Sequence, residues 1–148
     1  MTARSNADIA ALADRLLDRS LPKAEWTHAA HLTATLRLVR TRNANLERDL
    51  PEIIRTYNVA VGGVNDDQNG YHETITQAYL AAIRAFDAAL PPGVDDAEAA
   101  RRLLQTPLGD KEWPLRHWSR ERLFTPQARL GWLPPDLRPL DHPPTTTG

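Results

Sequence analysis

The chain has 148 residues, of which 18 are basic and 19 acidic, so its formal net charge is −1 at pH 7. This balance gives no electrostatic attraction to nucleic acid or to an anionic membrane surface, and we expect neither as a partner. The absence of cysteine excludes disulfide scaffolds, thiolate zinc sites and cysteine nucleophiles.

Hydrophobic residues (41%) and charged residues (25%) are near the values of globular domains. The first residues carry charges throughout and lack the apolar stretch of a signal peptide. No apolar run approaches the roughly 20 residues that span a bilayer. We therefore expect a cytoplasmic protein in which residues 1–148 form a single helical domain.

The first two predicted helices follow from capping residues and apolar spacing. One begins at Ser5 or Asn6, both good N-caps, and ends before Leu21-Pro22. The second begins near Thr27, whose hydroxyl can cap the first turn, and continues to about Thr41. Its residues are so largely apolar that we expect it to be buried on more than one side.

The next two helices flank a polar loop at 64–70. The segment Asp49-Leu50-Pro51-Glu52 combines a capping side chain, a proline in the first turn and a glutamate, and predicts a helix start. Gly62-Gly63 ends this helix, and another covers 71–90. An apolar stripe of helical spacing runs along it, with His72 one turn earlier: Ile75, Tyr79, Ile83 and Phe86.

The C-terminal third divides into short pieces. A helix begins at Asp95 or Asp96, a further helical segment extends from about 112 to 124, and Thr125-Pro126 opens a short helix to 130. The five prolines that follow are incompatible with regular structure, so we expect residues 131–148 to form an extended strap. Its expected anchors are Trp132, Leu133 and Leu137. The expected class is all-α: a small bundle of about five to seven helices, mostly antiparallel, with this Pro-rich strap.

Two histidines at the start of the second helix suggest chemistry. His28 and His31 are three residues apart, so their Cβ atoms share one helical face at roughly 5–6 Å. Both could reach one metal ion at about 2.0–2.1 Å. The pattern is a weak signal, because two such histidines can equally be one capping and one packing residue.

His72 and Glu73 support the interpretation of the histidines as metal ligands. His72 aligns with the apolar stripe, and a buried imidazole needs a hydrogen-bond partner or a metal. In an up-down bundle the starts of the second and fourth helices lie at the same end, so three histidines could share one zinc, copper, iron or nickel ion. Glu73 would be a fourth ligand or a general base; alternatively it is a favourable charge in the first turn. Without a metal, the cluster could act as acid–base machinery.

A second candidate region is the aromatic and basic stretch 113–120. Trp118 with Trp113 could wall a pocket, and Arg116 or Arg120 could hold an anionic substrate. Tyr79 joins them as a substrate-binding candidate. Tryptophans and arginines in such stretches are more often core and solvated residues. We expect a structural role for His117 and an exposed position for His142.

Three blocks occur together: W-T-H-x-x-H-L at 26–32, Y-H-E-T-x-T at 71–76 and P-D-L-R-P-L at 135–140. With them, the sequence resembles a group of small uncharacterised bacterial proteins, over most of its length. The resemblance implies no mechanism. It implies that the histidine blocks and the strap belong to one architecture.

The sequence leaves three functions open. The first is a small metal-dependent enzyme that acts on a small molecule through His28, His31 and His72. The second is a non-enzymatic helical module that binds a small molecule or a partner in an aromatic pocket. The third is a structural bundle whose histidines are capped and packed. The oligomeric state is undetermined by the sequence.

Overall fold

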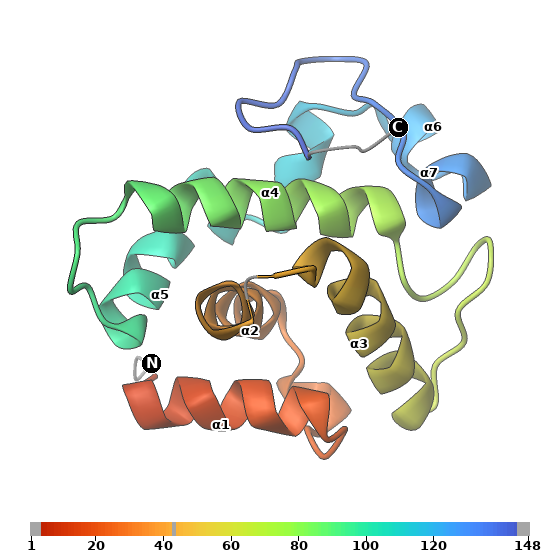
Figure 1. Cartoon of the computed structure of the whole chain (residues 1–148). Coiled ribbons are helices and arrows are strands. Elements are labelled where there is room, and N and C mark those ends of the chain that lie inside the picture. Colours follow the sequence, from red (N-terminus) through yellow and green to blue (C-terminus); the bar gives the residue numbers. More distant parts are fainter. Residues whose placement is uncertain (1–3, 43, 145–148) are drawn as a thin grey trace.

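The second predicted helix lies at the centre of the molecule. In the computed structural model, which describes residues 4–42 and 44–144, this is α2 (His28–Thr41). In Figure 1, α2 is seen along its axis, with α1 (Asn6–Leu17) and α4 (Glu73–Ala89) on opposite sides, and α3 (Leu46–Ala60) and α5 (Asp96–Leu104) on the other two. The prediction that this helix is buried on more than one side is confirmed by its buried residues: Ala30, Leu32, Thr33, Ala34, Thr35, Leu36, Leu38 and Val39.

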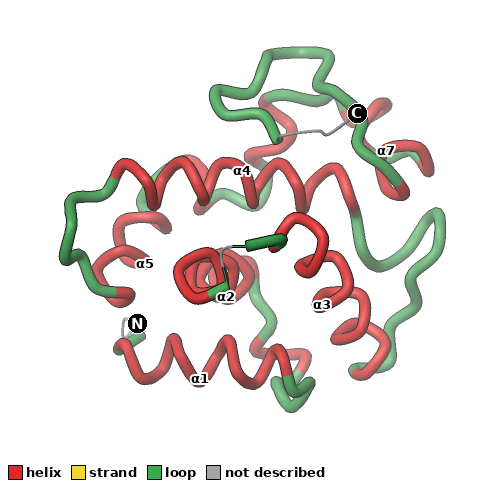
Figure 2. The backbone as a smooth tube through the Cα atoms, viewed as in Figure 1, coloured by secondary structure: helices red, strands yellow, loops and turns green. Residues whose placement is uncertain are grey.

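The remaining elements are short. The described residues contain seven α-helices, three 3-10 segments and no strand, so the all-α class is confirmed (Figure 2). None of these helices is long and apolar enough to cross a membrane. The short elements are η1 (Lys23–Glu25), η2 (Pro107–Gly109), η3 (Trp113–Arg116), α6 (Arg120–Leu123) and α7 (Pro126–Leu130).

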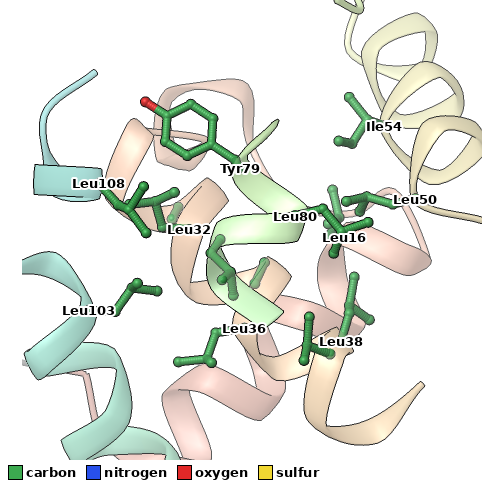
Figure 3. Close-up of a cluster of buried hydrophobic side chains, with 14 of the residues drawn as sticks. Leu16, Leu32, Leu36, Leu38, Leu50, Ile54, Tyr79, Leu80, Leu103 and Leu108 are labelled. Atoms are coloured by element: carbon green, nitrogen blue, oxygen red, sulfur yellow. The ribbon is translucent and has the colours of Figure 1, made fainter. Parts of the chain in front are cut away.

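The helices cross one another, and the expected antiparallel arrangement is wrong. Figure 1 shows α1 and α4 extending across the view while α2 points along it. Side chains from α2, α4, α5 and η2 meet where these helices cross, among them Leu36, Leu80, Leu103 and Leu108 (Figure 3). A helix that is buried on several sides can be covered by neighbours that cross it, because each neighbour then buries a different side.

Local capping chemistry was predicted well. Ser5 forms a capping box with Asp8, since the Ser5 hydroxyl accepts from the Asp8 N–H and the Asp8 carboxylate accepts from the Ser5 N–H. Thr27 caps α2, Asp95 caps α5 and Thr125 caps α7. These boundaries depend on contacts within four residues, which the sequence displays directly.

The predicted start of the third helix is wrong by one turn. The helix α3 begins at Leu46 after Asn45, so Pro51 lies inside it rather than in its first turn. Proline has no N–H, and the carbonyl oxygen of Glu47, four residues earlier, loses its usual partner. That oxygen accepts instead from the side-chain amide of Gln77 in α4 at 2.9 Å. A contact between helices therefore compensates for the proline.

The predicted helix over 112–124 is interrupted between η3 and α6. The C-terminal strap returns over this segment and uses its backbone. The carbonyl oxygen of His117 accepts from the N–H of Leu137 at 2.8 Å, and the N–H of Ser119 donates to the carboxylate of Asp136 at 2.8 Å. These bonds replace the helical ones, which explains the break.

The strap over residues 131–144 is extended, as predicted, and its anchors are partly those expected. Trp132 packs edge-on against Trp118 at 5.7 Å, and Leu133 is half-buried. The side chain of Leu137 is 60% exposed, so its predicted anchoring role is wrong; only its backbone is held. The last four residues of the predicted strap, 145–148, lie outside the described part of the chain.

Candidate functional site

His28 is half-buried in the first turn of α2 and makes two contacts outside that helix. Its Nε2–H donates to the carbonyl oxygen of Leu108 at 2.9 Å, and its ring meets the Tyr79 ring edge-on at 5.4 Å. Because a carbonyl oxygen only accepts, the proton is on Nε2 and Nδ1 keeps its lone pair. Within the described residues, Nδ1 of His28 therefore has no hydrogen-bond partner.

His31 lies one turn further along the same face. Its ring packs against Trp26 at 5.0 Å, and its two nitrogens make no hydrogen bond within the described residues. Burial, helped by the nearby His28, lowers the pKa of His31 from 6.5 to about 4. The imidazole is thus neutral at pH 7 and has a lone pair.

His72 differs from both, because its two ring nitrogens are already paired. Nδ1 accepts from the N–H of Ile75 at 3.2 Å and so caps the start of α4, while Nε2–H donates to the carbonyl oxygen of Leu123 at 2.8 Å. Burial lowers the pKa of His72 and favours this neutral form. No lone pair remains for a metal unless the cap is broken.

His72 also lies away from the point where His28 meets α4. His28 contacts Tyr79, seven residues after His72, which corresponds to about 10 Å along a helix axis. Within the described residues, no group of three histidine, aspartate or glutamate side chains is placed to hold a metal ion. The residues present do not fit the expected three-histidine site, and the crossing of α2 and α4 is the physical reason. A metal at His28 and His31 alone stays a prediction.

Glu73, the predicted general base, is held in a hydrogen-bonded group at the start of α4. The Tyr71 hydroxyl donates to one carboxylate oxygen at 2.6 Å, and the amide of Gln77 approaches the other at 3.4 Å. The guanidinium of Arg55 lies over the Tyr71 ring, 4.5 Å from its centre. Burial and the Glu73 contact raise the pKa of Tyr71, which keeps its proton on the hydroxyl. These contacts indicate a structural role for Glu73.

The four predicted substrate-binding residues do not gather around one cavity. Trp118 is completely buried, and its indole N–H donates to the carbonyl oxygen of Leu133 in the strap at 2.8 Å. Tyr79 is buried and donates to the carbonyl oxygen of Asp110 at 3.2 Å.

The two arginines are also engaged. Arg116 pairs with the carboxylate of Asp110 at 3.6 Å, and Arg120 with that of Glu112 at 3.5 Å. All four side chains are at least half exposed, so water weakens both pairs.

A cavity of about 290 Å³ lies between α4, η2, η3 and the end of the strap. Its size is close to the lower end of the range for small-molecule sites, about 300–1,000 Å³. Most of its wall is apolar, and Trp113, which the sequence suggested as a pocket wall, is part of it. The lining residues are Ala82, Ala85, Phe86, Ala89, Thr106, Pro107, Leu108, Trp113, His117, Leu140, Asp141 and His142.

His117 is the polar group built most deeply into this wall. Its ring is 7% exposed, and Nδ1–H donates to the carbonyl oxygen of Arg138 in the strap at 3.0 Å. Nε2 has no partner in the described residues, and it is not among their fully buried unpaired atoms, of which Thr33 Oγ1 is the only one. We infer that the small exposed part of the ring includes Nε2, as an acceptor on the cavity side.

The sequence predicts a structural role for His117 and an exposed position for His142. His142 is exposed, as predicted, at the rim of the cavity. His117 is structural through Nδ1, but its second nitrogen was missed. No spacing within 113–120 could reveal it, because the strap that fixes the ring comes from about twenty residues later.

An unbroken series of ring contacts connects the start of α2 to the strap. Successive centroids are 4.9 to 6.2 Å apart, and the rings stand tilted or edge-on to one another. Such arrangements are the favoured ones for aromatic pairs, so the series fixes the cavity wall at Trp113 and His117. The rings in order are His28, Tyr79, Trp113, His117, Trp118 and Trp132.

Comparisons of the chain with protein-family models, curated proteins and solved structures gave no match. The resemblance drawn from the three sequence blocks therefore stays a prediction.

Proposed function

We propose that this protein binds a small organic molecule in the cavity between α4, η2, η3 and the strap. The observation that carries the proposal is His117, a buried side chain in the wall of an apolar cavity, with one nitrogen fixed by the strap and no partner for the other within the described residues. Apolar walls with a few fixed polar groups are the usual composition of small-molecule sites. Because Nε2 has no partner within the described residues, a donor on a ligand could form a hydrogen bond with it.

The proposal is for binding rather than for a reaction. The polar side chains at the cavity are His117, Thr106, Asp141 and His142. The Thr106 hydroxyl is already engaged: it caps η2 by accepting from the N–H of Leu108 at 3.2 Å, and it donates to the carbonyl oxygen of Leu103 at 2.6 Å. No paired nucleophile and base, or pair of carboxylates, lines the wall. The metal-dependent enzyme suggested by the sequence has less support, since His72 has no free nitrogen.

A larger hollow of about 480 Å³ between α1 and η1 is a weaker candidate. Its wall carries four charged side chains and lacks aromatic ones, and Arg15 and Glu25 at its edge form an exposed ion pair at 3.5 Å. Such a surface is well hydrated and offers a small organic molecule little apolar contact.

The test uses a neutral aromatic probe, 2-naphthylmethanol, followed by amide chemical-shift changes in NMR. A ligand of this size should bind with a Kd on the order of 1 mM or tighter. We expect shifts in 82–89, 106–117 and 140–142. Ala85→Trp should fill the cavity and abolish them, while Ala88→Trp, exposed on the same helix and outside the cavity, should not. Absence of saturable shifts in wild type, or equal binding by Ala85→Trp, would overturn the proposal.

A further inference from the structure

The polar side chains that line the cavity are Thr106, His117, Asp141 and His142, and Asp141 is the one carboxylate among them. Asp141 supplies a carboxylate and His117 the lone pair of Nε2, while no lysine or arginine is among the lining residues. An anionic ligand would therefore meet the Asp141 carboxylate and no lysine or arginine there. A ligand that donates hydrogen bonds and carries positive charge would meet an acceptor at Nε2 of His117 and a negative charge at Asp141.

Aromatic faces add to this preference. Trp113 and Phe86 both line the cavity, and Trp113 is held by ring contacts with Tyr79 and His117 at 4.9 and 5.2 Å. The face of an aromatic ring carries negative charge density and attracts organic cations, most strongly for tryptophan. The fixed Trp113 ring can thus contribute without losing side-chain freedom on binding.

Two arginines of neighbouring elements are engaged with other carboxylates. Arg40 pairs with Asp87, which follows Phe86 in α4, at 2.8 Å, and Arg116 pairs with Asp110 at 3.6 Å. Asp141 forms no ion pair within residues 4–42 and 44–144. Its charge is thus left uncompensated at the cavity rim.

We propose that the ligand of this cavity is an organic ammonium ion with an apolar body. This inference rests on the proposed function and names its ligand class. The ammonium N–H groups would donate to Nε2 of His117 and to the Asp141 carboxylate. The apolar body would lie against Phe86, Leu108 and Trp113. One part of the site is deeply buried and the other lies at the rim, so the ligand has to be amphiphilic.

The experiment compares three probes of one shape at pH 7: 2-naphthylmethylammonium, 2-naphthylmethanol and 2-naphthoate. We expect the cation to bind about five-fold more tightly than the alcohol, the size of an exposed ion pair combined with a cation–π contact. The anion should bind more weakly than the alcohol. The advantage of the cation should shrink in about 1 M salt, where charges at the rim are screened.

Two variants test whether Asp141 is the charge that favours the cation. Asp141→Asn should reduce the affinity for the cation about two- to five-fold and leave that for the alcohol unchanged. Asp67→Asn, an exposed aspartate in the 64–70 loop, is the charge-matched control and should change neither. If the alcohol or the anion binds as well as the cation, or Asp141→Asn keeps the full preference, the inference is overturned while the proposed function stands. If none of the three probes binds, the proposed function itself fails.

Discussion

The side-chain amide of Gln77 donates to the backbone carbonyl oxygen of Glu47 at 2.9 Å, the oxygen that Pro51 leaves without its helical partner. Gln77 is 8% exposed, and it joins α4 to α3 where the two helices meet. A proline inside a helix is thus made tolerable by a residue 26 positions later in the sequence.

This relationship predicts a coupling between two substitutions. Gln77→Ala should lower the free energy of unfolding by about 1–2 kcal/mol, because the Glu47 oxygen loses its partner. In a Pro51→Ala background the new N–H can supply that partner, so Gln77→Ala should cost less. Urea denaturation of the four proteins measures the coupling. Strictly additive effects would show that the two residues act independently.

The hydroxyl of Thr74 in α4 helps to hold the strap. This completely buried hydroxyl donates to the carbonyl oxygen of Gly131 at 2.8 Å and accepts from the N–H of Leu133 at 3.1 Å. Thr74→Val keeps the shape and removes both bonds, which should cost about 2 kcal/mol or more. Thr41→Val, exposed at the end of α2, should have little effect and serves as the control.

Truncation after Leu130 tests the strap as a whole. It uncovers Trp118, which is 0% exposed in the complete chain, so the melting temperature should fall clearly. A truncated protein with the same melting curve as wild type would show that the strap adds no stability.

Replacing Thr33 should stabilise the folded protein. The Oγ1 of Thr33 is the one fully buried side-chain oxygen or nitrogen without a hydrogen bond in the described residues. Thr33→Val should raise the free energy of unfolding by about 1 kcal/mol, because the penalty for burying the hydroxyl is removed. Thr35→Val is the matched control: its hydroxyl donates to the carbonyl oxygen of His31 at 2.8 Å, so no gain is expected. Equal gains in both variants would contradict this explanation.

The lowered pKa of His31 should make the protein less stable in acid. The pKa of His31 is about 4 in the folded state and 6.5 ordinarily, so between these values the unfolded chain binds a proton that the folded chain does not. Stability should fall as pH drops from 6.5 to 4, by up to about 3 kcal/mol from this group. His72, whose pKa is also lowered, acts in the same direction. Unfolding at pH 7 and pH 4.5 should show a smaller difference for His31→Gln than for wild type.

The predicted metal site is tested by thermal shift with zinc. If zinc stabilises the protein, the structure predicts that His28→Ala and His31→Ala abolish the shift, because only those two histidines share a face with unpaired nitrogens. His72→Ala should lower the melting temperature through loss of the α4 cap and leave the zinc shift unchanged. A zinc shift that requires all three histidines would restore the original three-histidine hypothesis.

The sequence by itself determined the helical class, most helix boundaries and the extended strap. Caps such as Ser5, Thr27, Asp95 and Thr125 act on backbone groups within one turn, so the printed order of residues contains the whole interaction. Proline has the same local character, since it removes an N–H wherever it stands. Proline excludes a helix from the strap. In α3, however, Pro51 lies inside the helix and not in the first turn that the sequence predicts.

Only the tertiary structure decided how the chemistry-bearing residues are grouped. His72 aligns with the core-facing stripe of its helix, and the sequence could not show that Leu123 and Ile75 would pair both its nitrogens. The free nitrogen of His117 depends on the strap residue Arg138, and the position of His28 on the crossing of α2 over α4. Hydrogen bonds and crossing angles between distant segments follow from how whole helix faces pack, which the spacing of residues in one segment does not encode.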